Sequence, residues 1–243
     1  MTATRRALAV TCAMVTLGAV LAGSAHADLT PHGTFEAATL AIPTVPGADV
    51  QAQEVHVDTA HARHPVVSGV ATTSLTCDRC TGRATTLQIV YAKQATTLVA
   101  GNVATAWASG CTRCHGWALS LQVVILASAR TVTAANRALA LNAGCVSCTT
   151  RAAAIQIVVV GAPGRYLSGG AIARIVAQRD QLRAELASTA AQRVSPRTRA
   201  AASNPADRLG TRALAATTAR IQDVITADLR ATGASHHLKV AAG

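Results

Sequence analysis

Six of the seven cysteines form three Cys-x-x-Cys pairs: Cys77 with Cys80, Cys111 with Cys114, and Cys145 with Cys148. Two thiols at this spacing can close a disulfide, ligate a metal ion, exchange with other disulfides or attach a haem. The first cysteines of the three pairs are equally spaced along the chain. The pairs therefore belong to an internal repeat. Which of these chemistries they perform depends on the secondary structure that surrounds them.

Structural disulfides are the interpretation that the sequence favours. An even number of cysteines behind an export signal points to an oxidising compartment. Residues three apart in an extended strand are roughly 10 Å apart, whereas a disulfide needs Cα atoms about 4.4 to 6.8 Å apart. Each pair must therefore lie in a turn, and Gly110 and Gly144 directly before two of the pairs agree with this. Closure within each pair is favoured, but pairing between neighbouring repeats stays open, because six cysteines allow 15 connectivities.

Zinc binding and redox exchange are alternative uses of the same cysteines. Two pairs could supply a tetrahedral four-thiolate zinc site, although the segment between Cys80 and Cys111 is longer than the common spacing. Redox-active Cys-x-x-Cys motifs sit at a helix N-terminus beside a βαβ unit, whereas this motif recurs three times among strand-like segments. The alternative function is therefore an extracytoplasmic redox or metal-binding protein.

A covalent haem is the weakest of the cysteine hypotheses. Cys111 to His115 fits the Cys-x-x-Cys-His attachment pattern, which would make His115 an axial ligand. The other two pairs are followed by Thr81 and Thr149 instead. The only methionines, Met1 and Met14, fall in the export signal, so a second axial ligand would have to be another histidine. We expect no cofactor.

Amide side chains keep the same phase as the cysteines. Gln88, Gln122 and Gln156 each follow the first cysteine of their pair by the same interval, and Asn102 and Asn136 follow theirs by another constant interval. Stacked repeats place such residues at one level, where amides can bond from repeat to repeat as a ladder. We therefore interpret these five residues as structural.

The segments around the cysteines alternate strictly in side-chain type. Asn102 to Ala108 alternates small residues with others before the second pair, and Trp117 to Ile125 alternates large apolar residues with Ala118, Ser120 and Gln122 after it. A period of two with β-branched residues on one side is typical of strands. One strand face is small and mildly polar and the other is large and apolar, so we expect both faces to be covered.

The predicted fold is a mainly β repeat domain over residues 50–164, followed by a C-terminal α-helical hairpin. In this picture each repeat is an antiparallel hairpin with its cysteines at the tip, and the hairpins stack or meander. Residues 50–66 are expected to be a cysteine-free copy in which Glu54 takes the place of Gln88. The alternative is an all-α helical repeat, because alanine is abundant and the period of about 34 residues is also the length of a helix-turn-helix repeat.

The segments that flank the repeats differ from them in composition. Residues 165–191 and 205–233 have apolar side chains at helical spacing, with Ser168 as a cap of the first helix and Arg179 among its polar residues. Residues 192–204 are a basic linker. The Pro-rich residues 28–49 are expected to be a disordered N-terminal arm, and residues 234–243 a disordered tail. The helices should dock on the repeats or self-associate with another chain.

Residues 1–27 have the pattern of a Sec-type signal peptide. Arg5 and Arg6 precede an apolar run, and Ala25-His26-Ala27 is a cleavage site that would leave Asp28 as the first residue. The run is too short for a membrane span, and we expect no span elsewhere. We therefore predict a secreted protein.

Charge and motif content argue against an enzyme. Asp78 is the only acidic residue between residues 59 and 179, so the repeats lack paired carboxylates for acid–base catalysis. The chain has a formal net charge of +11 and so favours anionic partners such as cell-wall polymers. Its arginines are spread out and lack interleaved aromatic residues, which argues against specific nucleic-acid binding.

The block Asn-x-Ala-x-Ala-x-x-x-x-Cys-x-x-Cys-x-x-x-Ala-x-x-x-Gln, followed by a charged helical tail, resembles a group of uncharacterised secreted proteins of actinobacteria. The likeness covers roughly residues 50–230 and implies secretion and the repeat, but no activity. Together these observations predict a secreted, non-enzymatic, envelope-associated repeat protein held together by three disulfides.

Overall fold

The computed structural model describes residues 33–191, 205–231 and 237–242. Eight strands form the repeat domain: β1 (Thr34–Ala41), β2 (Asp49–Ala60), β3 (Val66–Leu75), β4 (Thr81–Ala92), β5 (Thr97–Ser109), β6 (His115–Leu126), β7 (Thr131–Ala143) and β8 (Thr149–Val160). Two helices, α1 (Gly169–Ala191) and α2 (Pro205–Ala231), and strand β9 (His237–Ala242) follow. The predicted signal peptide and basic linker lie outside the described residues.

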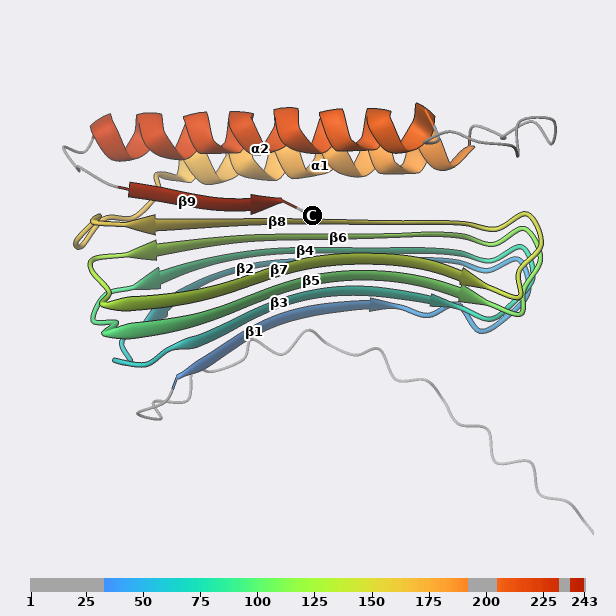
Figure 1. The fold of residues 1–243 in the computed structure, drawn as a ribbon, viewed down its shortest axis with the longest axis horizontal. Coiled ribbons are helices and arrows are strands. Elements are labelled where there is room, and N and C mark those ends of the chain that lie inside the picture. The colour runs from blue at the N-terminus through green and yellow to red at the C-terminus, as the bar shows by residue number, and fades with distance from the viewer. Residues whose placement is uncertain (1–32, 192–204, 232–236, 243) are drawn as a thin grey trace, which may run out of the picture.

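The eight strands form a two-sheet solenoid. Odd-numbered strands pair in the order β1-β3-β5-β7, and even-numbered strands in the order β2-β4-β6-β8, extended by β9. Each of β1 to β8 is parallel to its neighbours within its sheet, and β9 is antiparallel to β8. The chain therefore passes from one sheet to the other after every strand, and one turn of the solenoid is one repeat (Figure 1).

This topology confirms the expected fold class and corrects the pairing within it. A mainly β repeat domain with a period of about 34 residues is followed by two helices, as predicted. Consecutive strands do not form hairpins, however, because the Cys-x-x-Cys loop carries the chain to the opposite sheet. Each residue of β4 pairs with its counterpart in β6, and each of β6 with its counterpart in β8, so identical repeat positions stack directly on one another.

Two segments that we expected to be disordered contain strands. Residues 34–41 of the predicted N-terminal arm form β1, which pairs with β3 and buries Ala37, Thr39 and Ala41 against the interior. Residues 237–242 of the predicted tail form β9. The first turn is also shorter than the next, since Thr81 pairs with Asp49 on one side and with His115 on the other. His56, not Glu54, consequently occupies the position of Gln88.

The interior between the two sheets changes in side-chain size along the strands, and the end away from the cysteines holds larger residues such as Leu98 and Leu126. Its middle is lined by alanines, including Ala71, Ala104 and Ala118, and one end holds the cysteines with Leu75. Gly82 and Gly116 are required here, because a Cβ at either position would lie within 3.0 Å of side-chain atoms of Thr73 and Leu75. Small side chains therefore let the two sheets approach closely.

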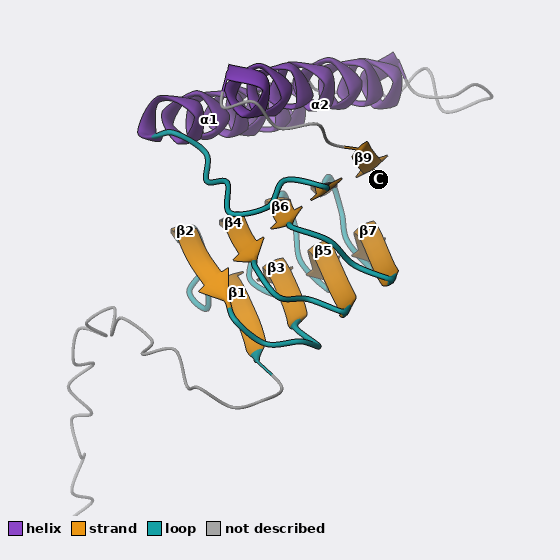
Figure 2. Ribbon diagram, turned by 90° about the vertical axis from the view of Figure 1, so that its left-hand side faces the viewer, coloured by secondary structure: helices purple, strands orange, loops and turns teal. Residues whose placement is uncertain are grey.

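Helices α1 and α2 cover the outer face of the sheet that contains β4, β6 and β8 (Figure 2). The large apolar residues of these strands, such as Leu121, pack against Ile175, Leu182, Ile221 and Ile225 of the helices. Ser168 caps α1, because its Oγ accepts a hydrogen bond from the backbone N–H of Ala171 at 3.1 Å. Both faces of β4, β6 and β8 are largely buried, as the alternation predicted, whereas Val55 and Val57 of β2 are exposed; we call this sheet the covered sheet.

The other sheet, β1-β3-β5-β7, has no helix of the described chain on its outer face, and we call it the open sheet. Its inner residues, such as Ala104 and Ala106, are buried, while its outer residues are half-buried or exposed. No helix in the described residues is long and apolar enough to cross a membrane.

The stacked cysteine loops as candidate functional site

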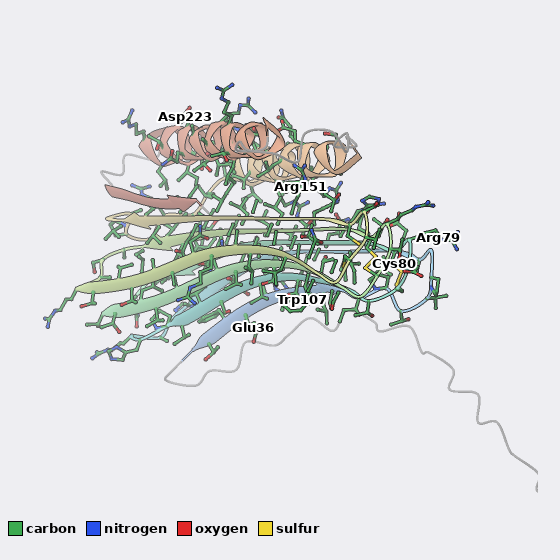
Figure 3. All side chains as sticks on the ribbon, turned by 45° about the vertical axis from the view of Figure 1, so that its right-hand side comes forward. Glu36, Arg79, Cys80, Trp107, Arg151 and Asp223 are labelled. Carbon is green, nitrogen blue, oxygen red and sulfur yellow. A yellow bond between two sulfur atoms is a disulfide. The ribbon has the colours of Figure 1, made fainter. Side chains whose placement is uncertain are left out.

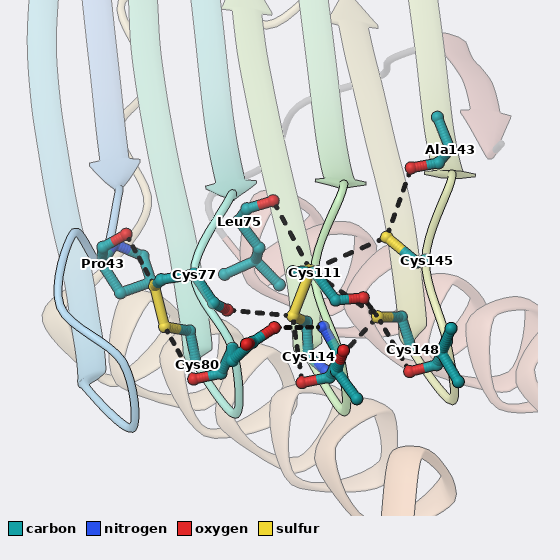
Figure 4. The surroundings of a disulfide bond; sticks show 12 residues. Pro43, Leu75, Cys77, Cys80, Cys111, Cys114, Ala143, Cys145 and Cys148 are labelled. Carbon is teal, nitrogen blue, oxygen red and sulfur yellow. Dashed lines mark hydrogen bonds between the residues drawn. A yellow bond between two sulfur atoms is a disulfide. The ribbon is translucent and has the colours of Figure 1, made fainter.

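The Cys-x-x-Cys loops connect the two sheets at one end of the strands and stack in register from turn to turn (Figure 4). Backbone hydrogen bonds run from loop to loop: Arg79 N–H donates to the Thr112 carbonyl at 2.7 Å, and Arg113 N–H to the Val146 carbonyl at 2.8 Å. Asp78 adds a side-chain bond, because its Oδ1 accepts the N–H of Thr112 at 2.7 Å. The loops are thus an ordered continuation of the parallel sheets.

A left-handed residue closes each loop. Arg79, Arg113 and Ser147 occupy the third position of the three motifs and have φ values of 58°, 55° and 57°. Residues other than glycine seldom adopt this left-handed conformation. At the third position of each motif it turns the chain sharply. The turn brings the Cα atoms of Cys77 and Cys80 to 5.7 Å, and those of Cys111 and Cys114 to 6.3 Å.

The first two pairs form disulfides within their own repeats. The third pair does not: Cys145 and Cys148 are free thiols in the structure, so it contains two of the three predicted disulfides and the third stays a prediction. Cys145 and Cys148 are half-buried because β7 and β8 form the last turn of the solenoid, whereas Cys77, Cys80, Cys111 and Cys114 are buried. Repetition of the motif therefore does not give the three pairs the same environment.

The free thiols lie against the neighbouring disulfide. Cys111 Sγ is 3.7 Å from Cys145 Sγ and 3.6 Å from Cys148 Sγ. Cys148 Sγ donates to the Cys111 carbonyl at 3.2 Å and accepts the Cys114 N–H at 3.4 Å. Burial raises the pKa of the Cys148 thiol, so the protonated form is favoured.

The sulfur positions bear on the zinc and haem hypotheses. The Sγ atoms of Cys111, Cys114 and Cys148 lie within 4.8 Å of one another, so after reduction three thiolates from two repeats would face one point.

The haem hypothesis needs free sulfur atoms at Cys111 and Cys114 for thioether attachment. These two cysteines are bonded to each other in the structure, so their sulfur atoms are occupied. His115 begins β6 as the stack partner of Thr81 and Thr149, as expected for an ordinary repeat position.

The repeated glutamines form a hydrogen-bonded ladder through the interior. Gln122 Nε2 donates to Gln88 Oε1 at 2.9 Å, and Gln156 Nε2 donates to Gln122 Oε1 at 2.7 Å. The same amides also reach the open sheet, where Gln122 donates to the Gly101 carbonyl at 2.9 Å. The ladder therefore joins neighbouring turns and also joins the two sheets.

The asparagines form a second, shorter ladder on the other side of the interior. Asn102 Nδ2 donates to Asn136 Oδ1 at 2.7 Å and to the Ile155 carbonyl at 2.9 Å. Ser120 donates to Asn102 Oδ1 at 2.6 Å, and Asn136 donates to the Ala154 carbonyl at 2.9 Å. All five repeated amides thus bond within the stack.

Other predicted features are arranged differently from the sequence pattern. Arg179 is 5% exposed, although its spacing placed it among the polar residues of α1; it pairs with Asp180 at 2.8 Å. His56 and Glu54 are hydrogen-bonded to each other on β2. Both pairs are local in sequence, because Asp180 directly follows Arg179 and Glu54 lies two residues before His56 on one strand face, but the burial of Arg179 had no signal in the sequence.

Comparison with known proteins gives no relative. No protein-family model matches the chain, no curated protein matches it, and no solved structure matches it.

Proposed function

We propose that this chain is an exported, non-enzymatic repeat protein that works at the cell envelope and binds anionic polymers through its basic loop edges. One observation carries the proposal: the side chains that repeat with the period of the solenoid point into it and bond to the next turn. Residues that recur for a catalytic or ligand-binding purpose would instead face a shared surface.

Within the repeat domain, five of the eight basic residues lie in the loops at the two ends of the strands, where Asp78 is an acidic neighbour of Arg79. Arg79 and Arg113 are exposed on the cysteine loops, one turn apart, and Figure 3 shows Arg79 projecting from that end. Arg63, Lys93 and Arg130 are exposed on the loops at the opposite end. Parallel strands stack about 4.8 Å apart, so each edge presents closely spaced cations to a linear polyanion.

The experiment that tests this function is salt-dependent binding to dextran sulfate, with uncharged dextran as the control. We expect the mature protein to bind dextran sulfate at low salt and to be released at roughly 0.5 M salt, where charges are screened beyond a few ångströms. Substituting Arg79→Asn and Arg113→Asn together should weaken binding, because asparagine tolerates the left-handed conformation and removes two charges. Arg174→Asn on α1 is the matched control. Protein that stays unbound at low salt would contradict the proposal.

Export is tested separately. The signal-peptide pattern supports secretion with cleavage after Ala27. Protein recovered from the culture medium should begin at Asp28, and recovery of the uncleaved chain from the cytoplasm would contradict this part of the proposal.

Thiol chemistry at the last repeat is a second candidate function, supported by the two sulfur–sulfur distances to Cys111. A Cys145 thiolate could attack Cys111 Sγ, 3.7 Å away, break the Cys111–Cys114 bond and release the Cys114 thiolate; Cys148 could then attack Cys145 Sγ, release the Cys111 thiolate and close a Cys145–Cys148 disulfide. Alkylation followed by mass mapping tests this: exchange would distribute label over all four cysteines. Label confined to Cys145 and Cys148 would exclude it.

A further inference from the structure

The outer face of the open sheet is an apolar surface with no partner in the described chain. Half of the twelve exposed large apolar residues of the described chain lie on it: Leu40, Val66, Val99, Trp107, Leu139 and Leu141. Between them are small or β-branched residues such as Val70, Thr105 and Ala135. A contiguous apolar patch of this kind marks an interaction surface more often than a solvated one.

Charged residues are nearly absent from this face. Among the described residues that alternate outward on β1, β3, β5 and β7, only Glu36 and Arg137 are charged. Glu36 lies on β1 and Arg137 on β7, at opposite edges of the open sheet. Figure 3 places Glu36 and Trp107 on the side of the molecule opposite the helices.

We propose that a second copy of this chain covers the open sheet, face to face, about a two-fold axis that runs parallel to the strands. This rotation keeps the position along the strands and reverses the strand order. β3 of one copy then lies over β5 of the other, and β1 lies over β7. Sheets packed in this way are about 10 Å apart with their strands within roughly 30° of each other.

The charges of Glu36 and Arg137 favour this axis over a two-fold axis that lies in the interface but runs perpendicular to the strands. With the axis parallel to the strands, Glu36 lies over β7 of the second copy at the level of Ala135, one outward position away from Arg137. With the axis perpendicular to the strands, β7 would lie over β7 and bring the two arginines together. The first arrangement pairs opposite charges twice, and the second pairs like charges.

Side-chain size is also complementary in the favoured arrangement. Trp107 and Ser74 are neighbours in the sheet, so the rotation places each Trp107 over a Ser74 of the second copy, a large residue over a small one. The same rotation places Val103 over Val70, and Leu40 over Leu139. At the other central levels Thr72 lies over Thr105 and Ser68 over Gly101, so the centre of the contact consists of apolar and small uncharged residues.

The size of the face is sufficient for a stable dimer. Four strands about 4.8 Å apart and ten residues long, at about 3.3 Å per residue, cover about 600 Å² on each copy. The total of about 1,200 Å² is at the lower end of the range for specific interfaces. Self-association through the C-terminal helices, the other prediction, has less apolar surface available, because Ile175, Leu182 and Ile221 are buried on the covered sheet.

The test is the mass of the mature protein by sedimentation equilibrium over a range of concentrations, with non-reducing gels to exclude dimers linked through Cys145 or Cys148. We expect a reversible dimer. Val103→Arg should raise the dimer dissociation constant by roughly a hundredfold or more, because a charge would be buried at the centre. Val57→Arg is the matched control, since Val57 is 47% exposed on β2, away from this face, and the dimer should persist.

A charge exchange tests the orientation. Arg137→Glu should weaken the dimer about tenfold, and adding Glu36→Arg should restore it. Circular dichroism and thermal unfolding of each variant report whether the monomer still folds. A wild-type monomer at every concentration would overturn the proposal, whatever the result with dextran sulfate. A dimer that both charge variants leave unchanged would overturn the two-fold arrangement.

Discussion

The covered sheet and the open sheet are built from the same repeat and share one interior, but their outer faces carry different residues. On the covered sheet the outward residues of the central strands are large: Leu119, Leu121, Val123 and Ile125 on β6. On the open sheet the corresponding residues of β5 are Gly101, Val103, Thr105 and Trp107. In the middle of the strands, the inward residues of both sheets are small or carry amides.

The difference shows that separate constraints determine which residues occupy the inner and the outer face of a strand in this solenoid. The inner face is limited by the distance between the sheets, which leaves no room for a Cβ at Gly82 and Gly116 but accommodates Leu98 and Leu126 at the end away from the cysteines. The outer face is limited only by what covers it. Large aliphatic residues lie on the outer face that the helices cover. Valine and threonine predominate on the outer face of the open sheet, and they are typical of strands with one exposed face.

Matched leucine substitutions should give the largest difference between the two sheets in the loss of unfolding free energy. Leu121 on β6 is 1% exposed beneath the helices, and Leu139 on β7 is 48% exposed. We expect Leu121→Ala to lower the free energy of unfolding by about 4 kcal/mol, because it removes buried methyl groups and leaves a cavity. Leu139→Ala should cost less than about 1 kcal/mol.

Chemical denaturation at one low protein concentration measures both values without a contribution from association. Equal losses in the two variants would mean that something in solution also covers the open sheet of the isolated chain, and the comparison would fail.

Substitution in the glutamine ladder tests how much stability the interior shared by the two sheets contributes. Gln122→Leu should cost about 3 kcal/mol, because Gln88 Oε1 and the Gly101 carbonyl would lose a buried hydrogen-bond donor. Gln94→Leu, in the exposed loop between β4 and β5, is the control and should change stability little. An unchanged midpoint of denaturation for Gln122→Leu would show that the ladder adds no stability to the stack.

The ladder also shows how far the sequence predicts this fold. A residue that recurs once per repeat and bonds to its own copy requires identical positions at one level, and only parallel, in-register strands provide that. Alternation predicts strands and identifies both faces of β6, but it does not name the partner strand. The antiparallel hairpin was therefore wrong although the ladder, the period and the two helices were placed from the sequence.

The remaining errors arise where the repeat is incomplete. β1 and β9 lack cysteines and amides, so composition indicated disorder, whereas their backbones pair with β3 and β8. The shift of Glu54 to His56 follows from the shorter first turn. Cys145 and Cys148, which are free thiols in the structure, differ from the other four cysteines in lying half-buried in the last turn, and the motif does not encode that place.

The disulfides lie where the chain crosses between the sheets, and they give a smaller effect. Replacing Cys77 and Cys80 by alanine should cost about 2 kcal/mol, the chain-entropy value for a very short loop. Replacing Cys145 and Cys148 by alanine should cost less than about 1 kcal/mol, because the structure has no disulfide there. Denaturation without reductant measures both, and in reductant the difference should disappear. Equal losses without reductant would indicate a third disulfide in solution.

Tyr91 gives the smallest effect, at the junction between the covered sheet and α1. Its hydroxyl accepts a hydrogen bond from the Leu167 N–H at 3.2 Å, so Tyr91→Phe should cost about 1 kcal/mol near neutral pH. Burial raises the pKa of Tyr91 above the ordinary value of 10.0. The unfolded chain therefore loses this proton first as the pH rises, and stability should fall above about pH 10 until the folded tyrosine also ionises.

The pH effect has to be separated from that of Tyr166, whose ring centroid lies 4.6 Å from that of Tyr91. A hydrogen bond from Lys93 lowers the pKa of Tyr166, so ionisation of Tyr166 favours the folded state and opposes the effect of Tyr91. In a Tyr166→Phe background, stability should decline as the pH rises above about 10, and adding Tyr91→Phe should flatten that decline. An equally steep decline in the double variant would assign the pH dependence to other groups and leave Tyr91 as a packing residue of the covered sheet alone.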